Sequence, residues 1–516
     1  FEMSRQGVKI RDMKRIYTGS QAREADVRTS QLHKIPGLVL MERAALSVSD
    51  YIEDKYAKRT RILCLAGTGN NGGDAMALCR ILFVRGFDVS YCLLGPESGL
   101  SESARIQYQS LLSYGLSSLA VEETDFKSFD LIVDGIFGIG LSRDIQNPLA
   151  RLIGKVNASG RPVIAMDIPS GLNADTGAVM GACIRAGDTF SFQFLKPGIL
   201  LGQGRSVCGR VYLPEIGIDA LETGATPPVR LALEREDLDG FLTDRDATGN
   251  KGSFGKVLVV AGSEEICGAA VLSSQAALLS GAGMVRLYTH EKNRTVIGTA
   301  FPEALITTYG NSWSRDEVKE AMDWADSILI GPGIGRSDRA REILDFVLSG
   351  PALPAVIDAD ALNLLSEEPN RLLKPHGKWI LTPHMGEMAR LTGKGISWLK
   401  EHALEAAETF ARDYQVDLIL KDATTVTALP CGRTYLNNSG NSGMATAGSG
   451  DVLAGLCAGY LAQKKNPEEV AAYAVFIHGM AGDLAAAKKG KGAMIAGDIL
   501  EALPQITRDG GAMAAV

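Results

Sequence analysis

The chain has 516 residues, of which 46% are hydrophobic, 22% are charged and 58 are glycine, and its net charge is −7. This length predicts more than one domain, and the composition is that of a globular protein that buries large cores without disulfides. The acidic balance argues against a broad nucleic-acid-binding face, because such a face needs clustered Lys and Arg to displace counterions. Anionic small molecules are still compatible with local sites.

The sequence shows no targeting or membrane signal. No run of about 18 uncharged apolar residues is present, so we expect no membrane span. The N-terminal stretch is charged and lacks the apolar segment of a secretory signal. The eight cysteines are scattered without a CxxC pair, which fits reduced thiols and offers no zinc site. We therefore expect a cytoplasmic protein with small-molecule partners and neither nucleic acid nor membrane. Association into a homo-oligomer is compatible with the sequence.

Short apolar runs that end in glycine or polar residues recur along the chain and are typical of buried strands followed by loops. They begin at Arg61, Leu131, Pro162, Lys256, Ser327, Pro354, Trp379 and Leu418. Stretches of helical periodicity lie between them, as at residues 77–86 and 402–414. This alternation predicts α/β units with a mostly parallel sheet, in which ligands bind at the carboxyl ends of the strands.

The best domain boundary lies near residues 217–228, where strand and helix periodicity is lost and Pro227 and Pro228 occur. A new series of strands begins at Lys256. We therefore divide the chain into domains of residues 1–222 and 223–516.

The sharpest feature of the first domain is the segment AGTGNNGGD at Ala66–Asp74, which follows a strand and opens a helix. Its glycines have GxGxxG spacing, which lets backbone N–H groups approach a phosphate at a helix N-terminus. An ordinary dinucleotide-binding fingerprint would also need an acid at the end of the next strand, and that strand ends without one. A tight turn alone would not need the polar side chains of Asn70, Asn71 and Asp74.

Two further strands of this domain end in acids, namely Asp134 and Asp167, and Ser170 follows the second. Each carboxylate alone could cap a helix or anchor a loop. Three polar strand ends in one α/β unit fit a shared site better. Asn71, Asp134 and Ser170 offer only oxygen ligands, which suits a hard cation.

These motifs resemble the N-terminal domain of the YjeF family, an epimerase that repairs hydrated NADH and NADPH. The similar stretches are Met41–Ala45, Gly67–Asp74, Val133–Leu141, Asp167–Gly177 and Phe194–Gly198. The resemblance implies a Rossmann-like three-layer αβα domain, K⁺ at Asn71, Asp134 and Ser170, and Asp167 as the catalytic acid/base. It also implies contacts with the hydrate at Asn70, Asn71, Gly72, Gly73, Asp74, Gly138, Ile139, Gly140, Leu141, Ser142, Arg143, Asp144 and Asp167. Ala75 and Ile139 stand where the family usually has Gly and Thr.

The most specific string of the second domain is NSGNSGMATAGSGDVLAG at Asn438–Gly455. A Gly/Ser loop runs into an apolar helix, so its N–H groups and the helix dipole can form an anion hole for phosphate. Asp451 lies at the mouth of this hole. A carboxylate beside phosphate is electrostatically unfavourable, so its position indicates a function such as deprotonating a hydroxyl. The alternative is that Asp451 is a helix N-cap. No P-loop signature is present.

Other strand ends of this domain carry polar or glycine-rich segments. Gly331–Gly335 can bring backbone close to a ligand, and Asp358–Asn363 offers acids and an amide. Thr382–Glu387 contains His384 and Glu387, and Lys421–Thr425 offers a cation and hydroxyls suited to phosphates. We interpret His478, on a predicted helix, as a packing residue.

Together these motifs resemble the C-terminal domain of the same family, a ribokinase-like α/β domain that dehydrates the S hydrate with ADP or ATP. The resemblance implies Asp451 as the catalytic base, hydrate contacts at Gly333, His384 and Asp451, and Mg²⁺ accompanying the nucleotide. Nucleotide contacts are implied at Lys421, Asp422, Ala423, Thr424, Thr425, Asn441, Ser442, Gly443, Met444, Ala445, Thr446, Ala447, Gly448, Ser449 and Gly450. Met385 stands where Pro is usual.

The sequence thus predicts a bifunctional enzyme that interconverts the R and S hydrates and dehydrates the S hydrate back to NADH or NADPH. The alternative is a ribokinase-type kinase of a small alcohol, with an N-terminal binding or scaffold domain that has no reaction of its own.

Overall fold

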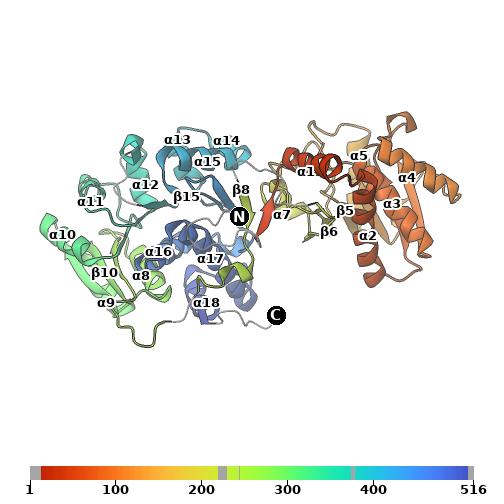
Figure 1. Ribbon diagram of the computed structural model, residues 1–516. Helices are drawn as coiled ribbons and strands as arrows, with labels where there is room; N and C mark the ends of the chain where they lie inside the picture. Colours follow the sequence, from red (N-terminus) through yellow and green to blue (C-terminus); the bar gives the residue numbers. More distant parts are fainter. Residues whose placement is uncertain (1–12, 219–228, 243–244, 374–377, 509–516) are drawn as a thin grey trace. The chain divides into compact units, whose positions relative to one another are not determined.

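All eight apolar runs that predicted strands form strands in the computed structural model, which describes residues 13–218, 229–242, 245–373 and 378–508 (Figure 1). The chain divides into two compact units, Lys14–Thr226 and Pro227–Val516, and Met13 packs in the second unit. The predicted boundary after residue 222 lies outside the described residues and stays a prediction.

The N-terminal unit is built on one parallel sheet with the strand order β3-β2-β4-β5-β6-β7. Its strands are β2 (Arg61–Ala66), β3 (Asp88–Leu93), β4 (Leu131–Gly135), β5 (Val163–Met166), β6 (Asp188–Phe190) and β7 (Arg210–Tyr212), and the unit also contains β1 (Lys14–Ile16). Its helices are α1 (Gly19–Leu32), α2 (Gly37–Lys55), α3 (Asn70–Val84), α4 (Glu102–Ser113), α5 (Leu149–Ala158), α6 (Pro197–Leu200) and α7 (Gly204–Val207).

Both faces of this sheet are buried, because successive side chains of each strand point to opposite sides. Ile62 and Cys64 of β2 pack in one core with residues of α1 to α4. Leu63 and Leu65 of the same strand pack in a second core with residues of α5. The unit therefore has three layers, with helices on both faces of the sheet.

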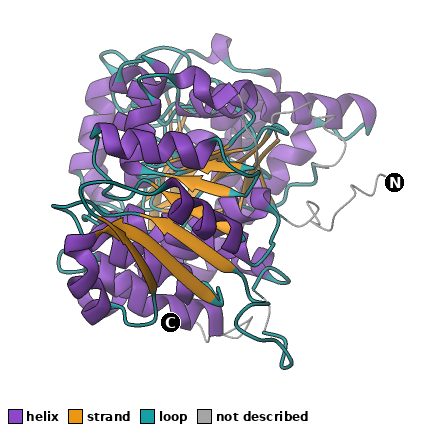
Figure 2. Ribbon diagram, turned by 90° about the vertical axis from the view of Figure 1, so that its left-hand side faces the viewer, coloured by secondary structure: helices purple, strands orange, loops and turns teal. Residues whose placement is uncertain are grey.

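The C-terminal unit contains a larger sheet in which the strands run in the order β8-β17-β16-β15-β14-β13-β12-β9-β10-β11. From β15 to β11 every neighbouring pair is parallel, whereas β16 is antiparallel to both β15 and β17. The strands are β8 (Val229–Ala232), β9 (Lys256–Val260), β10 (Met284–His290), β11 (Leu305–Tyr309), β12 (Ser327–Ile330), β13 (Ala355–Ile357), β14 (Trp379–Leu381), β15 (Asp417–Leu420), β16 (Val426–Ala428) and β17 (Arg433–Leu436). In Figure 2 the strands, drawn in orange, lie between helices, drawn in purple.

The helices of this unit are α8 (Gly268–Leu279), α9 (Arg294–Ala300), α10 (Arg315–Trp324), α11 (Asp338–Leu348), α12 (Ala359–Leu365), α13 (Met385–Thr392), α14 (Ile396–Glu401), α15 (Ala403–Tyr414), α16 (Ser449–Ala462), α17 (Pro467–Lys489) and α18 (Ala496–Arg508). α8, α16, α17 and α18 share one hydrophobic core with alternate residues of the strands. By length and composition alone α17 would pass as a membrane span, but 72% of its most apolar window is buried inside the unit. Its hydropathy is that of a core helix.

α16 packs so closely on α8 that only glycine fits at two of its positions. A Cβ atom on Gly455 would lie 2.1 Å from the Ser273 carbonyl oxygen, and one on Gly459 would lie 2.4 Å from that of Ala277. Because these contacts are with backbone, a side chain would have to push the helices apart. This packing holds the first turn of α16, which carries Asp451, against the core.

We expect Gly455→Ala to lower the free energy of unfolding of the C-terminal unit by about 2 kcal/mol, because overpacking a tight helix contact forces backbone shifts. Chemical denaturation followed by circular dichroism measures this. Gly298→Ala on α9 is the matched control, since the nearest atom to the added methyl would be 4.0 Å away. Equal effects of the two substitutions would contradict the packing argument.

Candidate active sites

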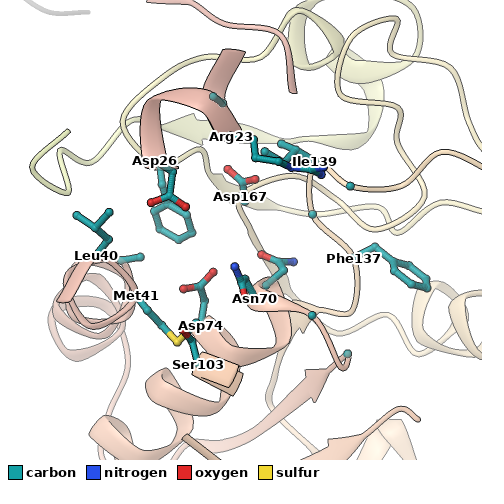
Figure 3. Close-up of a pocket in the computed structure, with 18 of the residues that line it drawn as sticks. Arg23, Asp26, Leu40, Met41, Asn70, Asp74, Ser103, Phe137, Ile139 and Asp167 are labelled. Carbon is teal, nitrogen blue, oxygen red and sulfur yellow. The ribbon is translucent and has the colours of Figure 1, made fainter. Parts of the chain in front are cut away.

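A cavity of about 520 Å³ opens at the carboxyl ends of the strands of the N-terminal unit (Figure 3). Side chains from α1 and α2 and the loops after β2, β4 and β5 line it. Of the predicted hydrate contacts, the cavity wall contains Asn70, Asn71, Asp74, Gly138, Ile139, Gly140, Leu141 and Asp167. Apolar side chains such as Met41, Phe192 and Ile218 complete the wall, so the cavity suits a ligand with a ring and polar substituents.

The other predicted hydrate contacts do not line this cavity, and the two glycines among them have packing tasks. A Cβ on Gly72 would lie 1.8 Å from the Gly67 carbonyl oxygen, and one on Gly73 would lie 2.5 Å from the terminal methyl of Met41. Gly72 therefore permits the strand-to-helix turn, and Gly73 permits the close packing of α3 against α2. Gly72, Gly73, Ser142, Arg143 and Asp144 stay predictions as contact residues.

Asp134 and Ser170 form a buried network beneath the cavity. The Ser170 hydroxyl donates to Asp134 Oδ1 at 2.6 Å, and the Ser170 N–H donates to Asp134 Oδ2 at 2.7 Å. The Phe137 N–H donates to the Ser170 oxygen at 2.8 Å. Burial raises the pKa of Asp134 to about 6, against the opposing effect of the hydrogen bonds from Ser170. This network ties the end of β4 to the loop after β5.

Asn71 lies above this network with its side-chain amide buried, and neither its oxygen nor its nitrogen has a hydrogen-bond partner. Leaving such groups unpaired costs about 1–3 kcal/mol each. A Cβ on Gly138 would lie 3.3 Å from the side chain of Asn71, so the amide faces the loop that carries Phe137. By its chemistry, an amide oxygen, a carboxylate and a hydroxyl suit a hard cation.

Asp167, the predicted acid/base, follows β5 and faces the cavity. It adopts a φ of +64°, in the left-handed region, and accepts a hydrogen bond from Lys196 at 2.5 Å. Lys196 is 2% exposed. In the sequence, Lys196 is only part of the motif that carries the family resemblance, which implies no role for it in the site. A lone lysine inside an apolar segment, FQFLKPGILL, was the signal available for it.

Two more carboxylates, Asp26 of α1 and Asp74 of α3, turn toward the same space as Asp167 in Figure 3. Burial raises the pKa of Asp26, and burial and the charge of Asp167 together raise the pKa of Asp74. Asp26 was not predicted from the sequence, because an acid on a helix preceding the first sheet strand gives no sign of facing the site.

The C-terminal unit has a second polar centre, at the carboxyl ends of β13, β14 and β15. Asp358 is 1% exposed, and its Oδ1 accepts hydrogen bonds from Thr382 at 2.6 Å and from Lys421 at 2.9 Å. Burial lowers the pKa of Lys421, but the charges of Asp358, Glu387 and Asp451 outweigh burial, so the pKa is raised. A Cβ on Gly450 would lie 3.2 Å from Lys421 Nζ, so this ammonium faces the glycine loop.

His384 is the N-cap of α13 and forms a capping box with Glu387. Its Nδ1 accepts from the Gly386 N–H at 2.9 Å, while Glu387 Oε2 accepts from the His384 N–H at 2.8 Å. Burial raises the pKa of Glu387 to about 7, and burial and the charge of Lys421 lower the pKa of His384. The His384 side chain is 54% exposed and is accessible to a ligand.

The predicted anion loop is anchored to α17 and opens α16. Asn441 Nδ2 donates to Asp483 Oδ1 at 2.9 Å, and the Gly440 N–H donates to Asp483 Oδ2 at 2.8 Å. Gly448, at a φ of +90°, precedes the first turn of α16, which contains Asp451. Burial and the charge of Asp358 raise the pKa of Asp451 to about 7, although Lys421 acts in the opposite direction.

The structure thus brings together Asp451, Lys421, His384 and the loop from Asn441 to Gly450 at the carboxyl edge of the sheet. Gly333, at a φ of +64°, lies in the loop after β12, and the segment from Lys421 to Thr425 joins β15 to β16. The ligand contacts assigned to these residues stay predictions. His478 is buried on α17 and its Nε2 lies 3.5 Å from the Ser449 hydroxyl, so it packs beneath the loop.

This fold and these two centres define a two-domain α/β enzyme with a carboxylate-lined cavity in one unit and a glycine-rich loop beside a lysine and acids in the other. The family model "YjeF-related protein N-terminus" matches residues 37–198, and the model "NAD(P)H-hydrate dehydratase" matches residues 257–505. The bifunctional NAD(P)H-hydrate repair enzyme Nnr of Moorella thermoacetica is 38% identical over 512 residues, covering 96% of this chain and 97% of its own. The chain therefore belongs to the family of bifunctional NAD(P)H-hydrate repair enzymes.

Solved structures are similar to the C-terminal part of the chain. A hypothetical protein of Streptococcus mutans has a TM-score of 0.50 and 28% identity, covering 55% of this chain and 100% of its own. The ADP/ATP-dependent NAD(P)H-hydrate dehydratase of Bacillus subtilis, co-crystallised with ATP and Mg²⁺, has a TM-score of 0.47 and 30% identity, covering 54% and 97%. The predicted fold class, Rossmann-like followed by ribokinase-like, and the predicted repair of hydrated NADH and NADPH by epimerase and dehydratase activities are confirmed.

The buried carboxylates give the stability of the protein a testable pH dependence. The pKa of Asp451 rises from 3.8 to about 7 on folding, so the folded state holds the proton over that range whereas the unfolded state loses it. The contribution of Asp451 to stability therefore falls as the pH rises from about 4 to 7. Asparagine resembles the protonated acid, so we expect Asp451→Asn to be more stable than the parent by roughly 2–4 kcal/mol at pH 8.

Urea unfolding at pH 4.5 and pH 8 checks this, with a much smaller difference expected at the lower pH. A stability difference that does not change with pH would contradict the burial of an ionised Asp451.

Proposed function

We propose that Asp167 shuttles the proton of epimerisation in the N-terminal cavity and that Asp451 removes the hydroxyl proton during dehydration at the C-terminal centre. One observation carries the proposal. Each unit places a proposed base near a lysine at the carboxyl edge of its sheet. Lys196 contacts Asp167 directly, whereas the partly buried Lys421 contacts Asp358 and lies near Asp451. Two such centres in separate units match two reactions on one damaged cofactor.

The epimerisation chemistry requires a positioned carboxylate. A hydrated nicotinamide ring carries a hydroxyl on the carbon next to the ring nitrogen. Inverting that carbon needs loss and return of hydroxide, or an equivalent ring opening and closure, and both routes move a proton. Asp167 faces the cavity with one oxygen held by Lys196, so its other oxygen is available to the substrate.

The cation set beside this cavity is proposed to hold K⁺ at Asn71, Asp134 and Ser170. The unpaired Asn71 oxygen supports this, because a bound cation would satisfy it. When bound, K⁺ supplies a fixed positive charge at the base of the cavity. The end of β4, the loop after β5 and the first turn of α3, which carry Asp134, Ser170 and Asn71, would then be held in one arrangement.

The dehydration chemistry uses the anion loop and Asp451. Hydroxide leaves poorly, whereas a phosphorylated hydroxyl can leave as phosphate, expelled by the lone pair of the ring nitrogen. Asp451 takes the hydroxyl proton as the oxygen attacks the terminal phosphoryl group of ADP or ATP, and the loop N–H groups stabilise the transferring charge. A pKa of about 7 suits a base at neutral pH.

Mg²⁺ would bind with the nucleotide and neutralise phosphate charge. Within the described parts of the chain, no three His, Cys, Asp or Glu side chains form a metal site. This fits a Mg²⁺ ion held mainly by phosphates and water, as is usual for this cation.

The two reactions should separate by mutation. We expect Asp451→Ala to abolish dehydration of the S hydrate and leave epimerisation intact, and Asp167→Asn to do the reverse, with a loss of about 10²-fold or more in each case. Recovery of NADH absorbance from purified S hydrate measures dehydration, and chromatography of the two hydrates measures epimerisation. If either variant lost both activities, or Asp167→Asn kept full epimerisation, the assignment would be wrong.

Potassium should stabilise the N-terminal unit through Asn71. Saturating KCl should raise the melting temperature of this unit by about 3 °C or more over choline chloride, because a ligand of the folded state alone stabilises it. Asn71→Ala should remove this difference. Asn70→Ala is the matched control and should keep it, because Asn70 already accepts a hydrogen bond from Ser101. A potassium effect that survives in Asn71→Ala would count against this site.

A further inference from the structure

Lys196 is a charged side chain that takes no part in the proton transfer proposed for epimerisation. Its ammonium is buried and donates to Asp167 Oδ1 at 2.5 Å, to the Ser191 hydroxyl at 3.1 Å and to the Phe192 carbonyl at 3.3 Å. An ammonium has three hydrogens, so these acceptors use all of them. Lys196 has no hydrogen left for a substrate and can act only through the groups that it holds.

The geometry of Asp167 shows what Lys196 holds in place. This residue has a left-handed backbone, which most side chains disfavour but Asp tolerates better than most, and its N–H donates to the Phe190 carbonyl at 2.8 Å. Lys196 binds Oδ1. The other oxygen, Oδ2, lies 3.5 Å from the position of a Cβ on Gly138, on the side of the cavity. One oxygen is thus clamped and the second is presented to the ligand.

The two other carboxylates of the cavity lack such a partner. Within the described residues neither Asp26 nor Asp74 forms an ion pair, and burial raises the pKa of both. Arg23 is the other cationic side chain on the cavity wall, and it lies beside Gly140. Of the three acids, only Asp167 therefore has an ion-pair partner among the described residues.

We propose that Lys196 is a positioning residue for epimerisation, which selects Asp167 among the three carboxylates of the cavity as the ionised and oriented base. This inference rests on the proposed role of Asp167. Without the lysine charge, the three carboxylates would face one another with no cation on Asp167, and neighbouring like charges disfavour the ionised form. The substrate would still bind, but fewer enzyme molecules would carry an ionised and oriented base.

The test compares the pH profile of epimerisation in four proteins. Lys196→Gln can still donate hydrogen bonds but carries no charge, Lys196→Met loses both, and Lys196→Arg keeps the charge. Lys55→Met is the matched control, since Lys55 pairs with Asp188 on the surface of the same unit at 3.2 Å. Dehydration of the S hydrate in each preparation reports that the C-terminal unit is folded, and near-ultraviolet circular dichroism reports on the N-terminal unit.

We expect Lys196→Gln to lower kcat about 100-fold at pH 7 with KM changed less than about threefold, as for loss of a general base. Its acidic limb should move up by about one pH unit or more, so that the deficit shrinks at pH 9. Lys196→Met should behave alike if it folds, Lys196→Arg should recover activity and profile, and Lys55→Met should match the parent.

A folded Lys196→Gln with an unchanged pH profile, or a deficit equal at every pH, would overturn the proposal. Asp167→Asn separates this failure from a failure of the proposed function. If Asp167→Asn is inactive and Lys196→Gln is normal, only the positioning role is wrong. If Asp167→Asn is active, the role of Asp167 itself is wrong.

Discussion

A lysine that pairs with an aspartate at the carboxyl edge of a parallel sheet organises each of the two sites. In the N-terminal unit Lys196 holds Asp167, and in the C-terminal unit Lys421 holds Asp358. Removing either partner of such a pair would leave an uncompensated buried charge, which typically costs 3–5 kcal/mol. The pairs therefore fix the local geometry, and the other acids of each site take their properties from them.

The two pairs do different work on the acids around them. Lys196 contacts the proposed base directly, whereas Lys421 contacts Asp358 and leaves Asp451 and Glu387 nearby with raised pKa values. The first arrangement places a positive charge directly against the proposed base and holds its orientation. The second raises the pKa of Asp451 to about 7. Near neutral pH a part of the molecules then carries the carboxylate that can take a proton from a hydroxyl, and the average negative charge that faces phosphate is smaller. Each arrangement suits the step proposed for its unit.

Much of the fold could be predicted from the sequence. The apolar runs at Arg61, Leu131 and Lys256 are strands because both faces of a parallel sheet are buried, which leaves a continuous apolar signal. The hairpin of β16 and β17 was not predicted, because its strands are short and contain threonine, arginine and tyrosine among the apolar residues. β16 pairs antiparallel with both β15 and β17, and no pattern in these short strands indicates that direction.

The sequence by itself determined the strands, the glycine loops and the polar residues that follow each strand, because these follow from local periodicity and from backbone needs of single residues. Only the tertiary structure decided which lysine neutralises which acid. Lys196 lies 29 residues from Asp167. Lys421 lies 63 residues from Asp358 and follows β15, which β14 separates from β13. Ion pairing and burial depend on distances in space, and those distances are set by the order of the strands in the sheet.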